Sequence, residues 1–485
     1  MNQQAMRVAL HRTRSRARSD ENWGLSVTLL LVVCALSGAI LGLDLASRLV
    51  LAVGFLAAAY GLVNPGVGLI GMGVLATTDP VLRETTFAGG MALPYNTLNY
   101  WLVLFCLLHA KHVFQLRQLQ SKLHLLLAVV VALGLLWSPS VYPLGLSKLL
   151  RVAAGVGLIV YFQVFPPSQQ RMLLWVAISA SAVATIFGVL VYTDPSMAAR
   201  FNPNSLSMMP LTALFTVFLV IFAKVAKRRE LHVLMLLGAA NLTFAFFSGS
   251  RGSMSTGLVL WLGILLWGFR LPQKIAYGFA AGFVVLALAA LSPQFQEFAL
   301  YRLEFTFDSS KTFAQRTSGR SEIAKAGWDM FLENPLGIGT GAFNEAMTRY
   351  YDPNVKFWDG RRKAAESAYV LVLAENGVIG ILVLFAYVSS FAWTGFRRRH
   401  YGLLPVGLIA SSVLAVRFLS EEFSALGVWW LAAGSVFLLY RPHTQKSSPP
   451  AVPWPGYVHR KSTLAMSGAQ FRHSLIAGRH QHERR

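Results

Sequence analysis

Residues 231–269 read LHVLMLLGAANLTFAFFSGSRGSMSTGLVLWLGILLWGF and carry a single formal charge, that of Arg251. The apolar runs on either side of Arg251 are long enough for a helix to cross most of a hydrocarbon core about 30 Å thick. We therefore predict two membrane helices, over residues 232–248 and 253–269, joined by a turn of small residues. An arginine at bilayer depth costs about 2.5–3.5 kcal/mol on insertion scales, so such residues usually line a wet cavity or contact an anion.

The whole chain is similarly apolar and carries few charges. Its 485 residues are 55% hydrophobic and 13% charged, which is too apolar for a soluble protein of this length. Water cannot satisfy backbone groups within the bilayer, so each apolar run must be helical, and the sequence lacks the alternating pattern of a membrane β-barrel. The composition predicts an all-α polytopic membrane protein.

Fourteen apolar ranges are candidate spans, and we expect about 12–14 transmembrane helices because the third range is weak. They are 25–43, 49–63, 66–78, 96–110, 123–137, 147–165, 172–193, 206–223, 232–248, 253–269, 275–291, 367–393, 403–419 and 425–440. These ranges divide the chain into five regions. We expect a basic N-terminus (1–24), a first bundle of helices (25–291), a large loop (292–366), C-terminal helices (367–440) and a basic, Pro-rich, disordered tail (441–485).

The positive charges predict the orientation of the chain. With the N-terminus in the cytoplasm, the short cytoplasmic segments before the tail carry eighteen Lys and Arg, and the short segments of the other face, counted with the adjoining ends of the predicted spans, carry seven. This excess follows the positive-inside rule and places both termini in the cytoplasm and residues 292–366 outside it. The formal net charge of +22 is spread over loops and tails and forms no docking face, so we expect no nucleic-acid partner.

The loop of 75 residues is too long for a simple connection, which marks it as a functional candidate. Its apolar side chains recur at helical spacing at Ile323, Ala326, Gly327, Met330 and Phe331. We predict an amphipathic helix there, ended by Asn334-Pro335, that lies at the membrane surface over a cavity.

The glycine-rich segment and the Cys and His residues are two patterns that can indicate a cofactor or metal site, but neither does so in this sequence. Residues 337–342, GIGTGA, match the dinucleotide pattern but follow a helix instead of a strand, so we interpret them as a turn. Cys34 and Cys106 both lie in predicted spans, and the eleven histidines show no ligand spacing. We expect no metal ion.

Four charged residues are candidates for chemistry on the non-cytoplasmic face: Arg200, Arg251, Arg320 and Glu366. Guanidinium groups bind phosphate oxygens bidentately, so two or three arginines facing one cavity suit a diphosphate leaving group, and a carboxylate can accept a proton from an acceptor hydroxyl. Simpler roles stay open. Arg251 could cap helix C-terminal carbonyls, Arg200 could be an exposed loop residue, and Glu366 could be an interfacial acid at a helix N-terminus.

Several fragments together resemble the bacterial O-antigen ligase and polymerase superfamily. They are Ser248–Gly252, Arg200–Asn204, Gly319–Gly339, Ala365–Tyr369 and Ala374–Gly380. The fragments occur together with the long loop, and the resemblance covers about residues 145–440.

The resemblance implies an integral-membrane, lipid-dependent glycosyltransferase that works without a metal ion at the periplasmic face of the bacterial inner membrane. Its donor would be an undecaprenyl-diphosphate-linked glycan, with Arg200 and Arg251 binding the diphosphate and Arg320 joining them. Glu366 stands where ligases of the family usually present a histidine. This departure favours a polymerase that extends exopolysaccharide or O-antigen on an acceptor glycan, over a ligase that transfers glycan to lipid A core or protein.

Two hypotheses from other classes remain. A transporter or flippase of lipid-linked glycan would also use many helices and intramembrane cations, although the sequence shows no convincing internal duplication. A scaffold would recruit other polysaccharide assembly proteins through its cytoplasmic tail.

Overall fold

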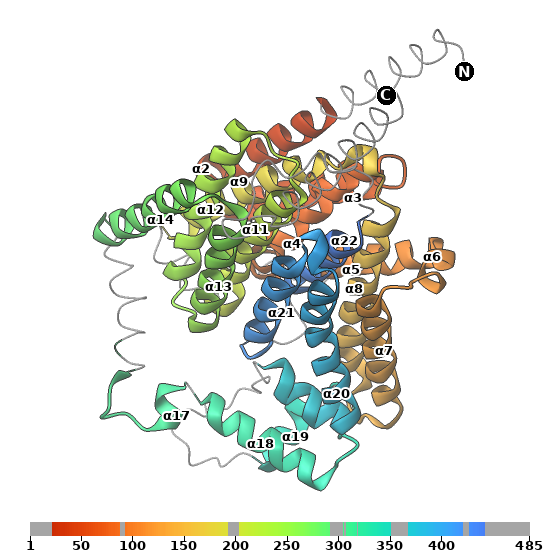
Figure 1. Cartoon of the computed structure of the whole chain (residues 1–485). Coiled ribbons are helices and arrows are strands. Elements are labelled where there is room, and N and C mark those ends of the chain that lie inside the picture. Colours follow the sequence, from red (N-terminus) through yellow and green to blue (C-terminus); the bar gives the residue numbers. More distant parts are fainter. Residues whose placement is uncertain are drawn as a thin grey trace, which may run out of the picture. The chain divides into compact units, whose positions relative to one another are not determined.

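The computed structural model describes residues 22–87, 93–192, 203–291, 304, 307–317, 319–350, 367–420 and 426–441. These residues form helices and no strand, so the predicted all-α class is confirmed (Figure 1). The chain divides into two units, Met1–Tyr440 and Arg441–Arg485. Apart from Arg441, the second unit lies outside the described residues.

Within these ranges, nine helices are long and apolar enough to cross a membrane. They comprise Asn22–Leu41, α3 (Leu43–Tyr60), α4 (Pro65–Phe87), α7 with η1 (Leu119–Trp137), α8 (Leu146–Val164), α9 (Met172–Tyr192), α11 (Pro203–Ala223), α12 (Arg228–Phe247) and α20 (Ala368–Arg397). Five further apolar helices accompany them: α5 (Leu93–Leu108), α13 (Arg251–Gly268), α14 (Leu271–Leu291), α21 (Leu404–Phe418) and α22 (Leu426–Tyr440). Each of the fourteen predicted ranges coincides with one of these helices.

The remaining described elements are shorter, and most connect the long helices. They are α2 (Gly38–Leu41, the end of the first span), α6 (Ala110–Phe114), η1 (Leu135–Trp137, which follows α7, Leu119–Gly134), η2 (Val141–Gly145), η3 (Pro167–Gln169), α17 (Phe313–Arg316), α18 (Arg320–Glu333), α19 (Phe343–Tyr350) and η5 (Arg399–Tyr401).

The third predicted span, weakest in the sequence, is α4, which lies at the centre of the bundle. It has the lowest hydropathy of the nine long helices, yet 89% of its most apolar window is buried. Small residues explain both properties. A Cβ on Gly71 would collide with the carbonyl oxygen of Gly54 in α3, so only glycine allows the two backbones to approach this closely.

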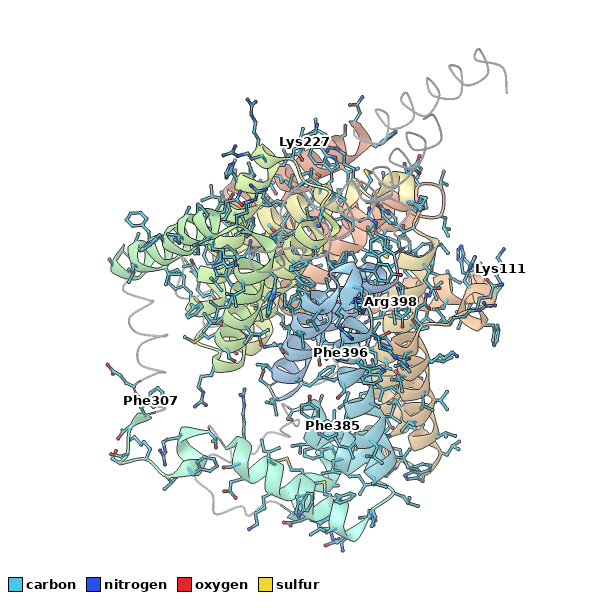
Figure 2. All side chains as sticks on the ribbon, in the orientation of Figure 1. Lys111, Lys227, Phe307, Phe385, Phe396 and Arg398 are labelled. Atoms are coloured by element: carbon cyan, nitrogen blue, oxygen red, sulfur yellow. The ribbon has the colours of Figure 1, made fainter. Side chains whose placement is uncertain are left out.

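α20 does not continue straight through its predicted range. Gly377 has φ 63° and ψ −156°, which breaks the helix into two parts. Tyr369 stacks on Phe385 with ring centroids 5.2 Å apart, although a straight helix would separate these residues by about 24 Å. Phe385 belongs to the second part of α20 and is labelled in Figure 2. The first part of α20 therefore folds back along the second part.

The helix predicted within the large loop is present as α18. Its buried face consists of Ile323, Ala326, Gly327 and Met330, and it ends at Glu333, directly before Asn334-Pro335, as predicted. Those side chains pack with α19 and with the first part of α20 around Phe343. Beyond this core, the Tyr350 hydroxyl donates a hydrogen bond to the Glu333 carboxylate, which raises the pKa of the phenol.

Candidate active site

Arg251 is the first residue of α13. The preceding turn depends on Gly249, whose φ of 64° lies in the left-handed region that favours glycine, and Ser250 is the N-cap. The Arg251 guanidinium donates a hydrogen bond to the backbone carbonyl of Arg316, the last residue of α17. Arg251 therefore does cap a helix C-terminus, and this contact ties the start of α13 to the large loop.

A network of buried hydroxyl groups lies directly behind Arg251. Ser253 donates to the Ser250 hydroxyl at 3.1 Å and hydrogen-bonds with Ser207 of α11. All three serine side chains are buried. The first turn of α13 is thus joined to α11 by polar groups in an otherwise apolar bundle.

Arg417 completes this network from α21. Its side chain is 0% exposed, and its Nη1 donates to the Ser253 hydroxyl at 2.8 Å. A Cβ on Gly252 would collide with the side chain of Ser420, so α13 and the end of α21 are in close contact. The buried guanidinium of Arg417 therefore contacts Ser253, which lies two residues after Arg251 in α13.

Sequence reasoning missed Arg417 as a site residue and counted it only as a charge that determines topology. The signal was present, because Arg417 is the only charged residue in the predicted span 403–419. The argument that singled out Arg251 applies equally here, since a charge in an apolar span is costly unless it is paired or functional.

The start of α20 docks onto the same end of α21. The Ser367 hydroxyl donates to the carbonyl of Phe418 at 3.2 Å, and the Tyr369 hydroxyl donates to the carbonyl of Ala415 at 3.4 Å. The beginnings of α13 and α20 therefore meet at the end of α21.

Two of the four predicted site residues, Arg200 and Glu366, lie outside the described residues. Arg320 is described. It begins α18 after the left-handed Gly319, and its N–H donates to the carbonyl of Thr317 at 3.2 Å. The structure thus places the Arg251 guanidinium at the backbone carbonyl of Arg316, which precedes Arg320 by four residues in the loop.

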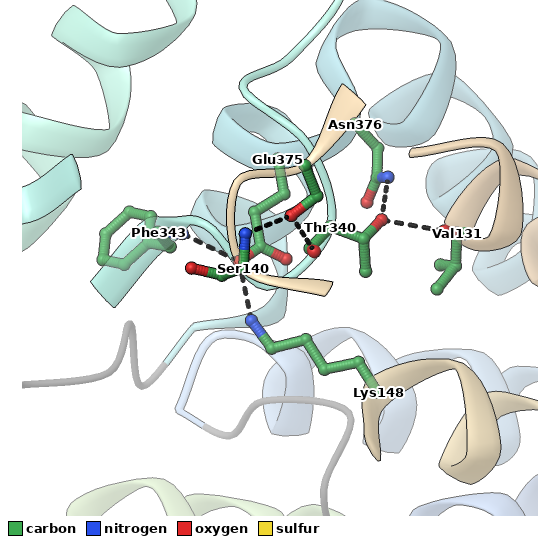
Figure 3. A network of polar contacts seen from close by, with 8 residues as sticks. Val131, Ser140, Lys148, Thr340, Phe343, Glu375 and Asn376 are labelled. Atoms are coloured by element: carbon green, nitrogen blue, oxygen red, sulfur yellow. Dashed lines mark hydrogen bonds and ion pairs between the residues drawn. The ribbon is translucent and has the colours of Figure 1, made fainter. Parts of the chain in front are cut away.

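A second polar cluster surrounds the break in α20 (Figure 3). Glu375 is 2% exposed, and its Oε1 accepts hydrogen bonds from Lys148 Nζ at 2.7 Å and from the Phe343 N–H at 3.1 Å. Asn376 donates to the Thr340 hydroxyl at 2.9 Å, and that hydroxyl donates to the Val131 carbonyl at 2.8 Å. Sequence reasoning treated residues 374–380 only as a family motif. The pairing of Lys148 with Glu375 was not visible because the two residues are 227 positions apart in the sequence.

The glycine-rich segment 337–342 forms turns, as predicted, and is not built as a nucleotide cradle. The backbone N–H groups of Ile338, Gly339 and Thr340 donate to the carbonyls of Ala374, Glu375 and Gly134. These amides bind the protein's own backbone, whereas a phosphate cradle would direct them toward a ligand.

Within the described part of the chain, no three His, Cys, Asp or Glu side chains gather as a metal site would require. The donor groups that gather beside Arg251 are instead guanidinium and hydroxyl groups. Such groups can donate hydrogen bonds to an oxyanion.

Comparison with known protein families gives one match. Residues 233–385 match the family model described as O-Antigen ligase. The matched range begins in α12, includes Arg251 and the large loop, and ends in the second part of α20. No curated protein matches the chain. The protein is therefore a multi-helical membrane protein that carries an O-antigen ligase family domain.

Proposed function

We propose that this protein is a polysaccharide polymerase that transfers an undecaprenyl-diphosphate-linked glycan to a growing carrier-linked glycan. Members of the O-antigen ligase family are enzymes that transfer lipid-linked glycans. The observation that carries the proposal is the pair of arginines, Arg251 and Arg417, beside the first turn of α13.

The donor diphosphate would bind at the start of α13. Arg251 and Arg200 would contact its oxygens, with Arg320 contributing from the loop. The positive end of the α13 dipole and the buried charge of Arg417 favour an anion at this place. The guanidinium groups can stabilise the negative charge of the leaving diphosphate, which supports a metal-independent mechanism.

The transfer itself needs a base for the acceptor. The acceptor hydroxyl oxygen bonds to the anomeric carbon, and the bond from that carbon to the phosphate oxygen breaks, leaving its electron pair on the diphosphate. The hydroxyl proton passes to the Glu366 carboxylate, which directly precedes Ser367 in the sequence. Glu366→Gln should then lower turnover by about 10²–10⁴-fold without weakening donor binding. Unchanged turnover would rule out this role.

The reaction would occur at the periplasmic face of a bacterial inner membrane, with the large loop on that face and both termini in the cytoplasm. The course of α12 supports this orientation. It begins beside the basic cluster Lys224–Arg229 and runs toward Arg251, so the candidate site lies at the end opposite the cluster.

Purified protein incubated with carrier-linked repeat units separates polymerase from ligase. We expect chains of increasing length without lipid A core, visible as a ladder on a gel. Transfer only onto added core would instead identify a ligase and overturn the polymerase proposal.

The break in α20 favours one alternative function, a transporter of lipid-linked glycan, because the substrate sites of secondary transporters are typically formed by discontinuous helices. Arg251→Ala distinguishes the two activities. If this variant abolished glycan movement across vesicles while already flipped substrate still polymerised normally, the protein would be a transporter and not the polymerase.

A further inference from the structure

The Lys148–Glu375 ion pair joins α8 to α20, whereas the candidate diphosphate site is at the start of α13. Lys148 belongs to the first turn of α8, and Glu375 lies two residues before the break in α20. Their side chains are 14% and 2% exposed. A buried pair is often no more stabilising than an apolar pair of the same volume, so its presence calls for a role other than stability.

One carboxylate joins three elements at this point (Figure 3). Glu375 receives Lys148 from α8 and the backbone N–H of Phe343, the first residue of α19, while it belongs to α20 itself. The interaction is directional, because Oε1 lies within hydrogen-bond distance of both donors. The apolar packing of α18 and α19 on α20 lacks this directionality and would tolerate sliding.

The break in α20 provides further attachment points. In a continuous helix the carbonyls of Ala374 and Glu375 would accept from N–H groups four residues later. Here they accept from Ile338 and Gly339 of the loop, while the N–H of Val378 donates to the Pro335 carbonyl. The backbone groups that lose their helical partners at the break therefore hydrogen-bond to the loop.

The loop is thus held at both ends of its described helices. Its α19 end is bonded to Glu375, and its α17 end accepts the hydrogen bond from Arg251. We propose that Lys148 and Glu375 are a positioning pair, which holds residues 313–350 against the bundle and so sets Arg316 and Arg320 relative to Arg251. This inference rests on the proposed function.

The double variant Lys148→Met/Glu375→Gln tests the pair without leaving a buried charge alone. Met retains the apolar stem of Lys148, and Gln retains a carbonyl oxygen for the Phe343 N–H. The matched control is Arg171→Met/Glu230→Gln, which removes a 2.6 Å ion pair whose side chains are 30% and 24% exposed, at the junction of α9 and α12.

Hydrogen exchange in lipid nanodiscs reports the position of the loop directly. We expect the amides of residues 337–347 to exchange about tenfold faster in the Lys148/Glu375 variant, with the other described helices unchanged and the control like wild type. Wild-type exchange in this segment would overturn the proposal, and so would faster exchange throughout the bundle, which indicates general destabilisation.

Turnover and binding separate positioning from donor recognition. In the same variant we expect the rate of glycan transfer to fall by about tenfold, while binding of undecaprenyl diphosphate changes by less than about twofold. Wild-type turnover in an otherwise active preparation would sink the positioning role alone. If wild-type protein bound no undecaprenyl diphosphate, the proposed function would fail instead, whatever the exchange measurement shows.

Discussion

At the scale of single residues, the candidate site contains two arginines at the first turn of α13, Arg251 from α13 itself and Arg417 from α21. Arg251 begins α13, and Arg417 hydrogen-bonds to Ser253 within its first turn. Each lies in a span or turn that is otherwise uncharged, where an arginine is costly. We propose that both arginines favour a dianionic ligand at the start of α13, which would account for this cost.

Arg417→Met tests whether Arg417 contributes to function. Met removes the guanidinium that donates a hydrogen bond to the buried Ser253 hydroxyl, so we expect the melting temperature to fall modestly. Turnover should fall by about one to two orders of magnitude, because interactions with a charged hydrogen-bonding group are worth roughly 1.5–3 kcal/mol. Wild-type turnover in the Met variant would remove Arg417 from the site.

The same residues show what a sequence can and cannot reveal about the site. A lone charge in an apolar run is visible in the sequence, and it identified Arg251. Arg417 is also a lone charge in an apolar run, but it was counted among the charges that predict the topology. Lys148 and Glu375 could not be paired in advance, because only the fold-back of α20 brings Glu375 to the start of α8.

At the scale of elements, the break in α20 determines where the loop is attached. All fourteen predicted ranges are helical because hydropathy and length are strong signals. The break was not predicted, since the apolar pattern continues through Gly377 and hydropathy does not report backbone conformation. The central position of α4 was not predicted either, because the glycines that allow its close packing also lower its hydropathy.

Gly377→Ala tests the break. The backbone conformation at Gly377 is one that only glycine adopts readily, and a Cβ there would collide with the carbonyl of Pro335. We expect a loss of about 1–3 kcal/mol in the free energy of unfolding, measured by thermal or denaturant melting in detergent.

Gly282→Ala is the control for that experiment. Gly282 lies within α14, and a Cβ there would meet nothing within 4 Å. Alanine is favoured over glycine in helices, so this variant should be neutral or more stable by up to about 1 kcal/mol. Equal stability changes in the two variants would contradict the structural role of the break.

At the scale of the whole molecule, the proposed orientation makes the loop and the basic connections face opposite sides of the membrane. Cys34 and Cys106 can be replaced by alanine, since both are free thiols within apolar helices. Ser310→Cys in the loop should then react with a membrane-impermeant maleimide added to intact spheroplasts. Lys227→Cys should react only after lysis, and the reverse pattern would invert the topology.

The central claim is that the start of α13 binds the diphosphate of a lipid carrier, and equilibrium binding of undecaprenyl diphosphate to purified protein tests it most directly. Arg251→Ala should weaken binding by about ten- to a hundredfold, and Arg251→Lys by less, because lysine keeps the charge but loses the bidentate geometry. Arg397→Ala, at the far end of α20, should bind like wild type. Equal affinity of wild type and Arg251→Ala would contradict the account.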